Sequence, residues 1–550
     1  MLECCAHPSG DERRHWPTNV VIWLAWVYPL LIRHGRMSVV NCGVLVRTSV
    51  LSICFASRLA AINHLMEVSM KSRFTVLLTA IVVAFGLTGC GGGEDDATAV
   101  ISSQPGGSNG ATDAANPNTP VSSSLSWSAA VRLSTAGAKI DYPAAAIAAD
   151  GFAVAAYVAE SGTDGGRVYV ATRQPQADSW SLPIVMSPMG QKPVRITPAS
   201  GWAPSSPAIQ VALNRLTGDA VFVWASQADA AFPGQASVWM ARYTRAANMW
   251  VAPVRLGYAT TMPAVSSNRR GDIAVVWAAP GSAGNSVLQG RMLAGGQLSS
   301  FGGVDAGSRV SAPQVVLDAS GEMTIAWRTA SSGAASSSTT GSQLNVLRAT
   351  ATNMTRTPER VLEDTGGDID FSLAGAESGA AVLGIGTSTG QIMTTIRASR
   401  EGVWTAPERM QGSAANYLPA VAIGKQGDAV LMFSAVDSVG ASYYQRTPWV
   451  ARYTAATGGW TAPRALSTST AGVGQPQAHL NDDGSALLSM RGTNVMTWRA
   501  TADTWQRTTH DLTGTAPVTA VDPESGRAVL LWVGDRVAVD RDGLMAQVLR

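Results

Sequence analysis

Four aspartates are the residues of this sequence best suited to acid–base chemistry. They lie in segments that we expect to connect β-strands, and they are Asp141, Asp364, Asp368 and Asp370. Hydrolysis of a glycosidic bond requires two carboxyl groups about 5 to 10 Å apart, one to protonate the leaving oxygen and one to act as nucleophile or base. The sequence supplies the carboxylates but does not place any two of them at that distance.

Motifs for other kinds of catalysis are absent from the sequence. It contains no Gly-x-Ser-x-Gly elbow, His-Glu-x-x-His helix, Walker loop or dinucleotide fingerprint. The segment Asn481-Asp482-Asp483-Gly484 matches a calcium loop only in part, because the distal glutamate is missing. Only two histidines lie beyond residue 89, so a histidine-based metal site or triad is not expected. We therefore predict no metal, no cofactor and no assigned catalytic residue.

Cys90 has the clearest chemical assignment in the chain. Residues 71–73 are Lys-Ser-Arg, residues 74–87 form an apolar run too short to span a membrane, and Leu87-Thr88-Gly89 directly precedes Cys90. This order resembles the signal peptide and lipobox of bacterial lipoproteins, which implies cleavage before Cys90 and acylation of its thiol and amino group. Acyl chains anchor a protein stably, since each buried methylene contributes about 0.8 kcal/mol. Residue 91 is Gly, not the aspartate that retains enteric lipoproteins at the inner membrane, so the resemblance favours the outer membrane, with its periplasmic or surface side left open.

The segments around this signal differ from the rest of the chain. Residues 1–69 hold four of the five cysteines and share no pattern with residues 125–550, so we interpret them as a misassigned upstream segment and 70–89 as the signal peptide. A metal site made of Cys4, Cys5 and His7 fits no tetrahedral zinc spacing. Residues 90–124 comprise the lipidated cysteine and a segment rich in Gly, Ser, Asn and Pro, which predicts a disordered tether. Random-coil scaling gives this tether a reach of roughly 30 to 35 Å.

The charge of the mature chain excludes one class of partner. Residues 1–89 carry eight of the 40 Lys and Arg residues and four of the 38 Asp and Glu residues, which leaves 32 positive and 34 negative residues, a formal charge of −2. Binding of nucleic acid requires a strongly basic surface. We therefore expect no nucleic-acid partner.

An eightfold repeat fills residues 125–550. Each copy contains a strand, a tight turn with Gly, a second apolar strand, a third strand ending in Arg and, in several copies, a fourth strand starting at Trp. The turn glycines are Gly151, Gly218, Gly271, Gly321, Gly379, Gly427, Gly484 and Gly526. A bulky apolar residue follows each glycine by six positions: Tyr157, Trp224, Trp277, Trp327, Ile385, Phe433, Met490 and Trp532. A period of about 40 to 67 residues with several strands per unit is typical of a radial β array.

This pattern resembles a β-propeller, an all-β fold of four-stranded blades around an axis. We predict eight blades; seven remain an alternative because the copy around Gly379 lacks the Pro that leads the first strand in the other copies, and also the Trp. Pro is tolerated at the first residue of a strand, where no N–H is needed. Residues 127–133 are expected to form the outer strand of the last blade beside a third strand at 537–541, so that the N-terminal strand closes the ring and protects its edges.

The repeat also separates packing residues from candidate binding residues. A residue type that recurs in every copy is interpreted as a packing device, with the tryptophans filling gaps between blades and the terminal arginines pairing with turn acids or Trp rings. The connections of variable length emerge on one face of an up-and-down blade array, and that face is the candidate binding surface. Its candidate residues are Lys192, Arg195, Trp202, Asp229, Phe232, Tyr443, Tyr444 and Arg446.

These observations favour binding over catalysis. Propeller sialidases carry Ser-x-Asp-x-Gly-x-x-Trp boxes at their blade turns, whereas the turns here read Gly-Asp-Ala or Asp-Gly-Ser. We expect a lipid-anchored, monomeric propeller that acts as a non-enzymatic binding or scaffold module for protein or glycan. A glycan-processing enzyme on the same scaffold, using the aspartates above, stays open as the alternative.

Overall fold

The computed structural model describes most of the repeat region. The described residues are 125–550 without 136–137, 161–165, 195, 197–207, 228–235, 283–284, 309, 331–340, 354–356, 411–415, 437–444, 467–469, 472–474, 492–494, 502–503, 511–513 and 535–542. The expected upstream segment, signal peptide and tether, with Cys90, lie outside them. Every helix or strand element within the described residues is a β-strand.

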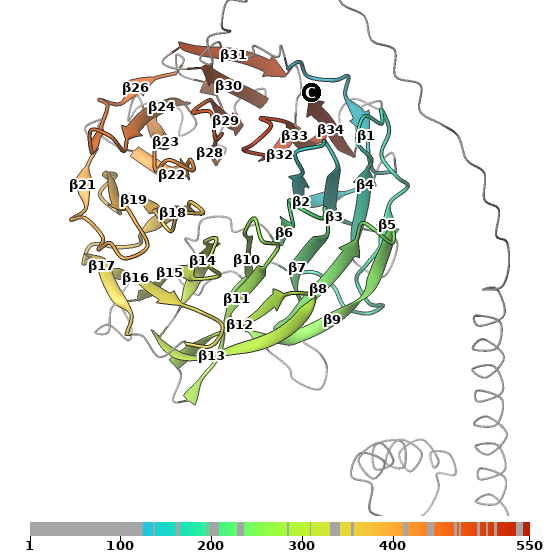
Figure 1. Cartoon of the computed structure of the whole chain (residues 1–550), viewed down its shortest axis with the longest axis horizontal. Helices are drawn as coiled ribbons and strands as arrows, with labels where there is room; N and C mark the ends of the chain where they lie inside the picture. Colours follow the sequence, from blue (N-terminus) through green and yellow to red (C-terminus); the bar gives the residue numbers. More distant parts are fainter. Residues whose placement is uncertain are drawn as a thin grey trace, which may run out of the picture. The chain divides into compact units, whose positions relative to one another are not determined.

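Eight antiparallel sheets surround a central axis, so the fold is an eight-bladed β-propeller (Figure 1). From the axis outward, the strands of blades 1 to 4 are β2 (Ile140–Ile147), β3 (Ala153–Ala159), β4 (Arg167–Arg173) and β5 (Ile184–Val185); β6 (Ile209–Leu213), β7 (Ala220–Ser226), β8 (Ala236–Thr244) and β9 (Met249–Ala259); β10 (Ala264–Ser267), β11 (Ile273–Pro280), β12 (Asn285–Ala294) and β13 (Gln297–Ser308); and β14 (Ser311–Leu317), β15 (Met323–Ala330), β16 (Ser342–Ala349) and β17 (Glu359–Asp364).

Blades 5 to 8 continue the ring with the same order of strands. They contain β18 (Asp370–Gly375), β19 (Ala381–Gly386), β20 (Ile392–Arg397) and β21 (Glu408–Arg409); β22 (Asn416–Ile423), β23 (Ala429–Val436), β24 (Gln445–Thr454) and an outer edge in three pieces, β25 (Gly459–Trp460), β26 (Arg464–Ala465) and β27 (Thr470–Ala471); β28 (Gln477–Leu480), β29 (Ala486–Arg491), β30 (Val495–Thr501) and β31 (Thr504–His510); and β32 (Gly514–Val521), β33 (Ala528–Gly534), β34 (Leu544–Leu549) and β1 (Val131–Arg132). The copy around Gly379 forms a complete blade, so the prediction of eight blades is confirmed and the alternative of seven is wrong.

The N-terminal strand closes the ring, as predicted. β1 pairs with β34, and Trp127 forms a further bridge with Leu549. The predicted partner was wrong, because β1 pairs with residues 544–549, and the predicted segment 537–541 lies outside the described residues. Leu544, Ala546 and Val548 of β34 are buried in the core.

The hydrophobic core lies between the blades, and the bulky residues after the turns build it. Trp224 packs in the cluster of blades 1 and 2, Trp277 in that of blades 2 and 3, and Trp327 in that of blades 3 and 4. Ile385, Phe433, Met490, Trp532 and Tyr157 continue this order around the ring, each against the preceding blade. The prediction that the tryptophans fill the gaps between blades is therefore confirmed for Trp224, Trp277, Trp327 and Trp532.

The inner strands depart from the prediction at their prolines. Pro263 and Pro476 directly precede strands β10 and β28, as expected. In blades 1, 4, 6 and 8 the inner strand instead begins earlier, and its proline falls at a shift of register: Pro143, Pro313, Pro419 and Pro517. A proline fits such a bulge because the extra residue of the bulge has no partner on the neighbouring strand and needs no backbone N–H for the sheet.

Candidate functional site

The ring has two unlike faces. The turns between strands one and two, and between strands three and four, lie on one face, which we call the turn face; it contains the eight turn glycines. The connections between strands two and three, and from each outer strand to the next blade, lie on the other, which we call the loop face. The longest connections lie on the loop face, as predicted.

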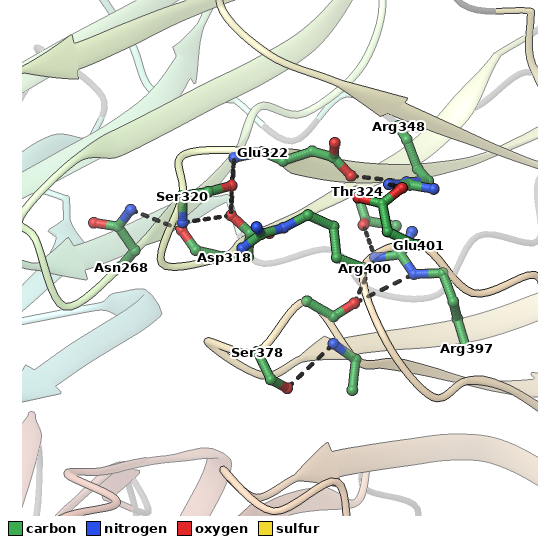
Figure 2. Close-up of polar contacts among 12 residues, drawn as sticks. Asn268, Asp318, Ser320, Glu322, Thr324, Arg348, Ser378, Arg397, Arg400 and Glu401 are labelled. Carbon is green, nitrogen blue, oxygen red and sulfur yellow. Dashed lines mark hydrogen bonds and ion pairs between the residues drawn. The ribbon is translucent and has the colours of Figure 1, made fainter.

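Polar side chains on the turn face join neighbouring blades (Figure 2). Asp318, in the first turn of blade 4, accepts hydrogen bonds from the backbone N–H groups of Ser320 and Glu322 at 2.8 and 2.9 Å. Its second carboxylate oxygen pairs with Arg400 of blade 5 at 2.6 Å, and its backbone carbonyl accepts from Asn268 of blade 3 at 2.8 Å. The carboxylate also accepts from the Ser320 hydroxyl at 2.6 Å. This bond, the pairing with Arg400 and the two N–H bonds hold the pKa of Asp318 below its usual value despite its burial.

The terminal arginines belong to the same network. Arg348 pairs with Glu322 at 2.7 Å, and the buried Arg397 donates to the Gly379 carbonyl and to Thr324 Oγ1, both at 2.8 Å (Figure 2). Burial and the positive charge of Arg348 lower the pKa of Arg397 to about 10. The prediction that the arginines pair with turn acids or Trp rings is confirmed here, since Arg397 also lies over Trp404 at 5.5 Å.

One contact of the turn face crosses the ring axis. Arg269 of blade 3 forms an ion pair with Asp482 of blade 7, and its backbone N–H donates to Glu377 of blade 5 at 2.8 Å. Blades 3 and 7 stand opposite each other in an eight-membered ring, so this ion pair spans the centre. The contacts of the turn face thus hold the ring together. This is the packing role expected of the residue types that recur in every copy of the repeat.

The structure describes two of the eight predicted binding-face residues. Lys192 is exposed in the connection that crosses blade 2, where its carbonyl accepts from the Gln227 N–H at 2.7 Å. Arg446 is the second residue of β24 in blade 6; it is half-buried and donates to Ser434 Oγ at 3.3 Å. These two residues lie in separate parts of the ring. The others lie outside the described residues, and they are Arg195, Trp202, Asp229, Phe232, Tyr443 and Tyr444.

Arg446 instead belongs with a group of charged residues on the loop face of blades 4 to 6, which we call the Arg–Asp cluster: Arg328, Asp368, Asp370 and Arg446. The buried Arg328 donates through Nε to Ser311 Oγ at 2.9 Å and through Nη1 to the Ile369 carbonyl at 3.1 Å. The same Nη1 lies 3.5 Å from Asp368 Oδ1, which also accepts from Ser342 Oγ at 3.2 Å. Arg328 therefore fixes the segment that leads into the inner strand of blade 5.

Asp370 is the member of this cluster whose pKa is raised. It is the first residue of β18, half-buried, and no hydrogen bond joins its carboxyl to the described residues. Burial raises the pKa of Asp370, and the negative charge of Asp368 raises it further, while Arg328 and Arg446 oppose both effects. A carboxyl group held in this way can accept a hydrogen bond when ionised and donate one when protonated.

The other two aspartates singled out in the sequence do not join the cluster. Asp364 Oδ1 accepts from the Gly366 N–H at 2.9 Å, and Oδ2 accepts from the Ser388 N–H and hydroxyl at 2.9 and 2.8 Å, so its role is to hold two loops. Asp141 lies in β2 of blade 1, on the opposite side of the ring from blade 5. Only Asp368 and Asp370 of the four therefore share one site.

Sequence reasoning missed Arg328, which organises the cluster. The sequence does contain a signal for Arg328. It is a charged residue directly after the core residue Trp327, in the second strand of the repeat, and this strand is apolar in most copies. A charged residue at such a buried position requires partners. The other residues of this strand are mostly apolar and indicate only that the strand is buried, so the strand pattern as a whole does not indicate a functional arginine.

The described residues contain neither a membrane-spanning helix nor a metal cluster. None of their elements is a helix long and apolar enough to cross a membrane. No group of three or more His, Cys, Asp or Glu side chains among them is arranged to hold a metal ion.

Comparison with known proteins gives likenesses of fold. No protein-family model matches the chain, and no curated protein matches it in sequence. Among solved structures it is similar to the polysaccharide lyase Uly1, at 12% identity and a TM-score of 0.41 over 63% of this chain and 90% of the other. It is also similar to the α-L-arabinanase of Penicillium chrysogenum, at 10% identity and a TM-score of 0.36 over 77% of this chain and 98% of the other. A third likeness is to the β-propeller domain of the Trilobed protease from Pyrococcus furiosus, at 6% identity and a TM-score of 0.38 over 68% and 96%. These similarities are too low to bear on function.

Proposed function

We propose that this chain is a lipid-anchored protein of the bacterial outer membrane whose propeller binds a ligand on its loop face without converting it. The Arg–Asp cluster is the observation that carries the binding proposal. It combines the Arg328–Asp368 ion pair with Asp370, whose pKa both Arg328 and Arg446 lower, and the Asp370 carboxyl has no hydrogen bond from the described residues. Glycan hydroxyls both donate and accept hydrogen bonds, so they match this mixture better than an apolar peptide does.

Binding is tested with a panel of envelope glycans and the mature chain carrying Cys90→Ala. Loss of a hydrogen bond to a charged group costs about 1.5 to 3 kcal/mol, which predicts that Asp370→Asn and Arg446→Gln each weaken binding about 10- to 100-fold. Glu408→Gln removes an exposed carboxylate from the outer strand of blade 5 and serves as the matched control, with unchanged affinity expected. Equal affinity of all four proteins, or capture of a stoichiometric protein partner with no glycan bound, would contradict the glycan assignment.

The anchor is tested separately from the ligand. We expect the chain with Cys90 to fractionate with outer membranes and the Cys90→Ala chain to appear in the soluble fraction. Two or more acyl chains give lasting membrane attachment, whereas their loss leaves only weak contacts. Unchanged membrane association of the Cys90→Ala chain would contradict lipidation at this residue.

One observation favours glycan processing as a second candidate function. Asp370 has a raised pKa and lies in the same cluster as Asp368, and such a pair can divide the roles of acid and base between two carboxyl groups. If the same glycan panel yields cleaved products, and if Asp368→Asn and Asp370→Asn each remove that activity, then the chain is an enzyme. Intact glycans after prolonged incubation support the binding module.

A further inference from the structure

The outer strands of the blades form the rim of the propeller, and the side chains exposed there differ in polarity from one side of the ring to the other. Most of the exposed large apolar side chains in the described part of the chain lie on, or next to, the outer strands of blades 1 to 3. We call this set the apolar rim: Leu182, Ile184, Val185, Met189, Met249, Val251, Val254 and Leu298. Leu182 and Met189 are 87% and 82% exposed, so they contribute almost nothing to the core.

The outer strands of blades 4, 5 and 7 have the opposite character. β17, β21 and β31 expose charged and polar side chains, and these are Glu359, Arg360, Glu363, Glu408, Arg409, Gln506 and Arg507. Charges on an edge strand prevent it from pairing with another chain. The outer strands of blades 1 to 3 expose only two charged side chains among their described residues, Arg255 and Asp305, against six on β17, β21 and β31. Exposed apolar side chains gathered in one region mark a surface that is covered by something else.

The chain enters the propeller next to the apolar rim. Ser126 and Arg550 exchange backbone hydrogen bonds at 2.9 and 3.1 Å in blade 8. The Arg550 side chain then pairs with Asp178 of blade 1 at 2.6 Å, four residues before Leu182. The predicted tether of residues 91–124 is therefore attached at the junction of blades 8 and 1, on the apolar side of the ring.

We propose that the apolar rim lies against the lipid of the membrane to which Cys90 anchors the chain. This inference rests on the anchor in the proposed function. A tether with a reach of roughly 30 to 35 Å keeps the rim at a high local concentration near the bilayer, so that weak apolar contacts are sufficient. Burial of each large apolar side chain in the lipid further stabilises the contact, whereas the charged outer strands of blades 4, 5 and 7 stay in water.

The resulting orientation matters for the ligand. A propeller that rests on its rim has its axis parallel to the membrane plane, because the rim strands run around that axis. The loop face then opens sideways along the membrane surface. The Arg–Asp cluster, in blades 4 to 6, would lie on the side of the ring away from the lipid and accessible to a ligand in solution.

The test uses the mature lipoprotein in vesicles of phosphatidylethanolamine and phosphatidylglycerol. Cys90 is the only cysteine beyond residue 89, and acylation blocks its thiol, so one introduced cysteine can carry one fluorescent label. The variants Leu182→Cys and Met249→Cys report on the apolar rim. Val403→Cys is the matched control, because Val403 is 82% exposed and lies in blade 5, opposite blade 1.

We expect the labels at 182 and 249 to shift to shorter emission wavelengths on reconstitution and to be quenched at least twofold more strongly by spin-labelled lipid than the label at 403. Equal quenching at all three positions would overturn the proposal. A blue shift that appears without lipid and grows with protein concentration would also overturn it, since a second copy of the chain would then cover the rim.

A second measurement separates this proposal from the anchor. The same labels on the Cys90→Ala chain are titrated with vesicles, and a lipid-dependent shift at 182 but not at 403 is expected at high lipid concentration. That result supports the rim contact even if Cys90 proves not to be acylated. No shift at 182 in either preparation refutes the rim contact while leaving the fractionation result for the anchor unaffected.

Discussion

His479 illustrates how one half-buried side chain makes stability depend on pH. Its Nε2 lies 3.0 Å from Thr519 Oγ1, which joins the inner strands of blades 7 and 8, and burial lowers its pKa from 6.5 to about 4. Between these two values the unfolded chain holds a proton on the histidine and the folded chain does not. Because the unfolded state then binds more protons, the free energy of unfolding decreases as the pH falls from about 6.5 to about 4.

We expect His479→Gln to remove much of this pH dependence. A pKa difference of this size corresponds to up to about 3 kcal/mol of stability lost between pH 7 and pH 4. Glutamine keeps a polar group near Thr519 but does not titrate. The measurement is the free energy of unfolding in urea at pH 7 and pH 4.5, and an identical pH dependence of parent and variant would disprove the assignment. His510→Gln is the comparison, because burial also lowers the pKa of His510.

At the scale of elements, the turn glycines determine where each blade begins. All eight have a positive φ, between 68° and 91°, a region that residues with a Cβ adopt only with strain. Their need for glycine is local, so it can be predicted from the residue pattern of the turn alone. The second strand can be predicted from the same pattern, since its apolar run is buried between two blades.

Gly484 and Gly459 form a matched pair that isolates this backbone effect. A Cβ added at either position would meet no atom within 4 Å, but only Gly484 has a positive φ, of 81°. We therefore expect Gly484→Ala to lower the free energy of unfolding by about 1 to 2 kcal/mol, and Gly459→Ala to change it by less than about 0.5 kcal/mol. Urea denaturation of the three proteins measures both values, and equal effects would show that φ is not the cause.

Other features of the strands and turns depend on contacts between distant parts of the chain, which the local residue pattern does not indicate. Tyr142, Ala312 and Leu418 adopt positive φ before the prolines of three inner strands, although none of these residue types favours it. The prediction for the third strand of blade 8 was wrong because two neighbouring segments, 537–541 and 544–549, are both rich in apolar residues. The Arg–Asp cluster combines residues from blades 4, 5 and 6, so its assembly depends on how successive blades turn about the axis. The fold class could thus be predicted from the sequence, whereas the site required the structure.

At the scale of the whole molecule, the ion pair between Arg269 and Asp482 joins opposite sides of the ring. A double-mutant cycle of Arg269→Ala and Asp482→Ala measures its contribution. We expect a coupling energy of about 0.5 to 2 kcal/mol, because the two side chains are 34% and 16% exposed and contact each other directly. The same cycle with Arg360 and Glu363, an exposed pair within β17, is expected to give less than about 0.5 kcal/mol. Equal coupling in the two cycles would contradict a special role of the axial pair.

Closure by the N-terminal strand is the property on which the whole ring depends. Besides the pairing of β1 with β34, four backbone hydrogen bonds attach this segment to the end of the chain, among them Ser128 N–H to the Val548 carbonyl at 2.8 Å and Leu133 N–H to the Leu544 carbonyl at 2.7 Å. Leu133 is also buried, against the core of blades 8 and 1. A chain that starts at Thr135 loses all of these contacts and exposes the edge of blade 8, whereas a chain that starts at Ser124 loses none of them.

We therefore expect the chain from Ser124 to unfold at the same urea concentration as the mature protein, and the chain from Thr135 to be less stable by at least about 3 kcal/mol. A peptide of residues 124–134, added in excess, should raise the stability of the shorter chain, because it restores the outer strand of blade 8. If the chain from Thr135 unfolds at the parent midpoint, the ring is held by its inter-blade cores and by the axial ion pair, and the outer strand of blade 8 contributes little.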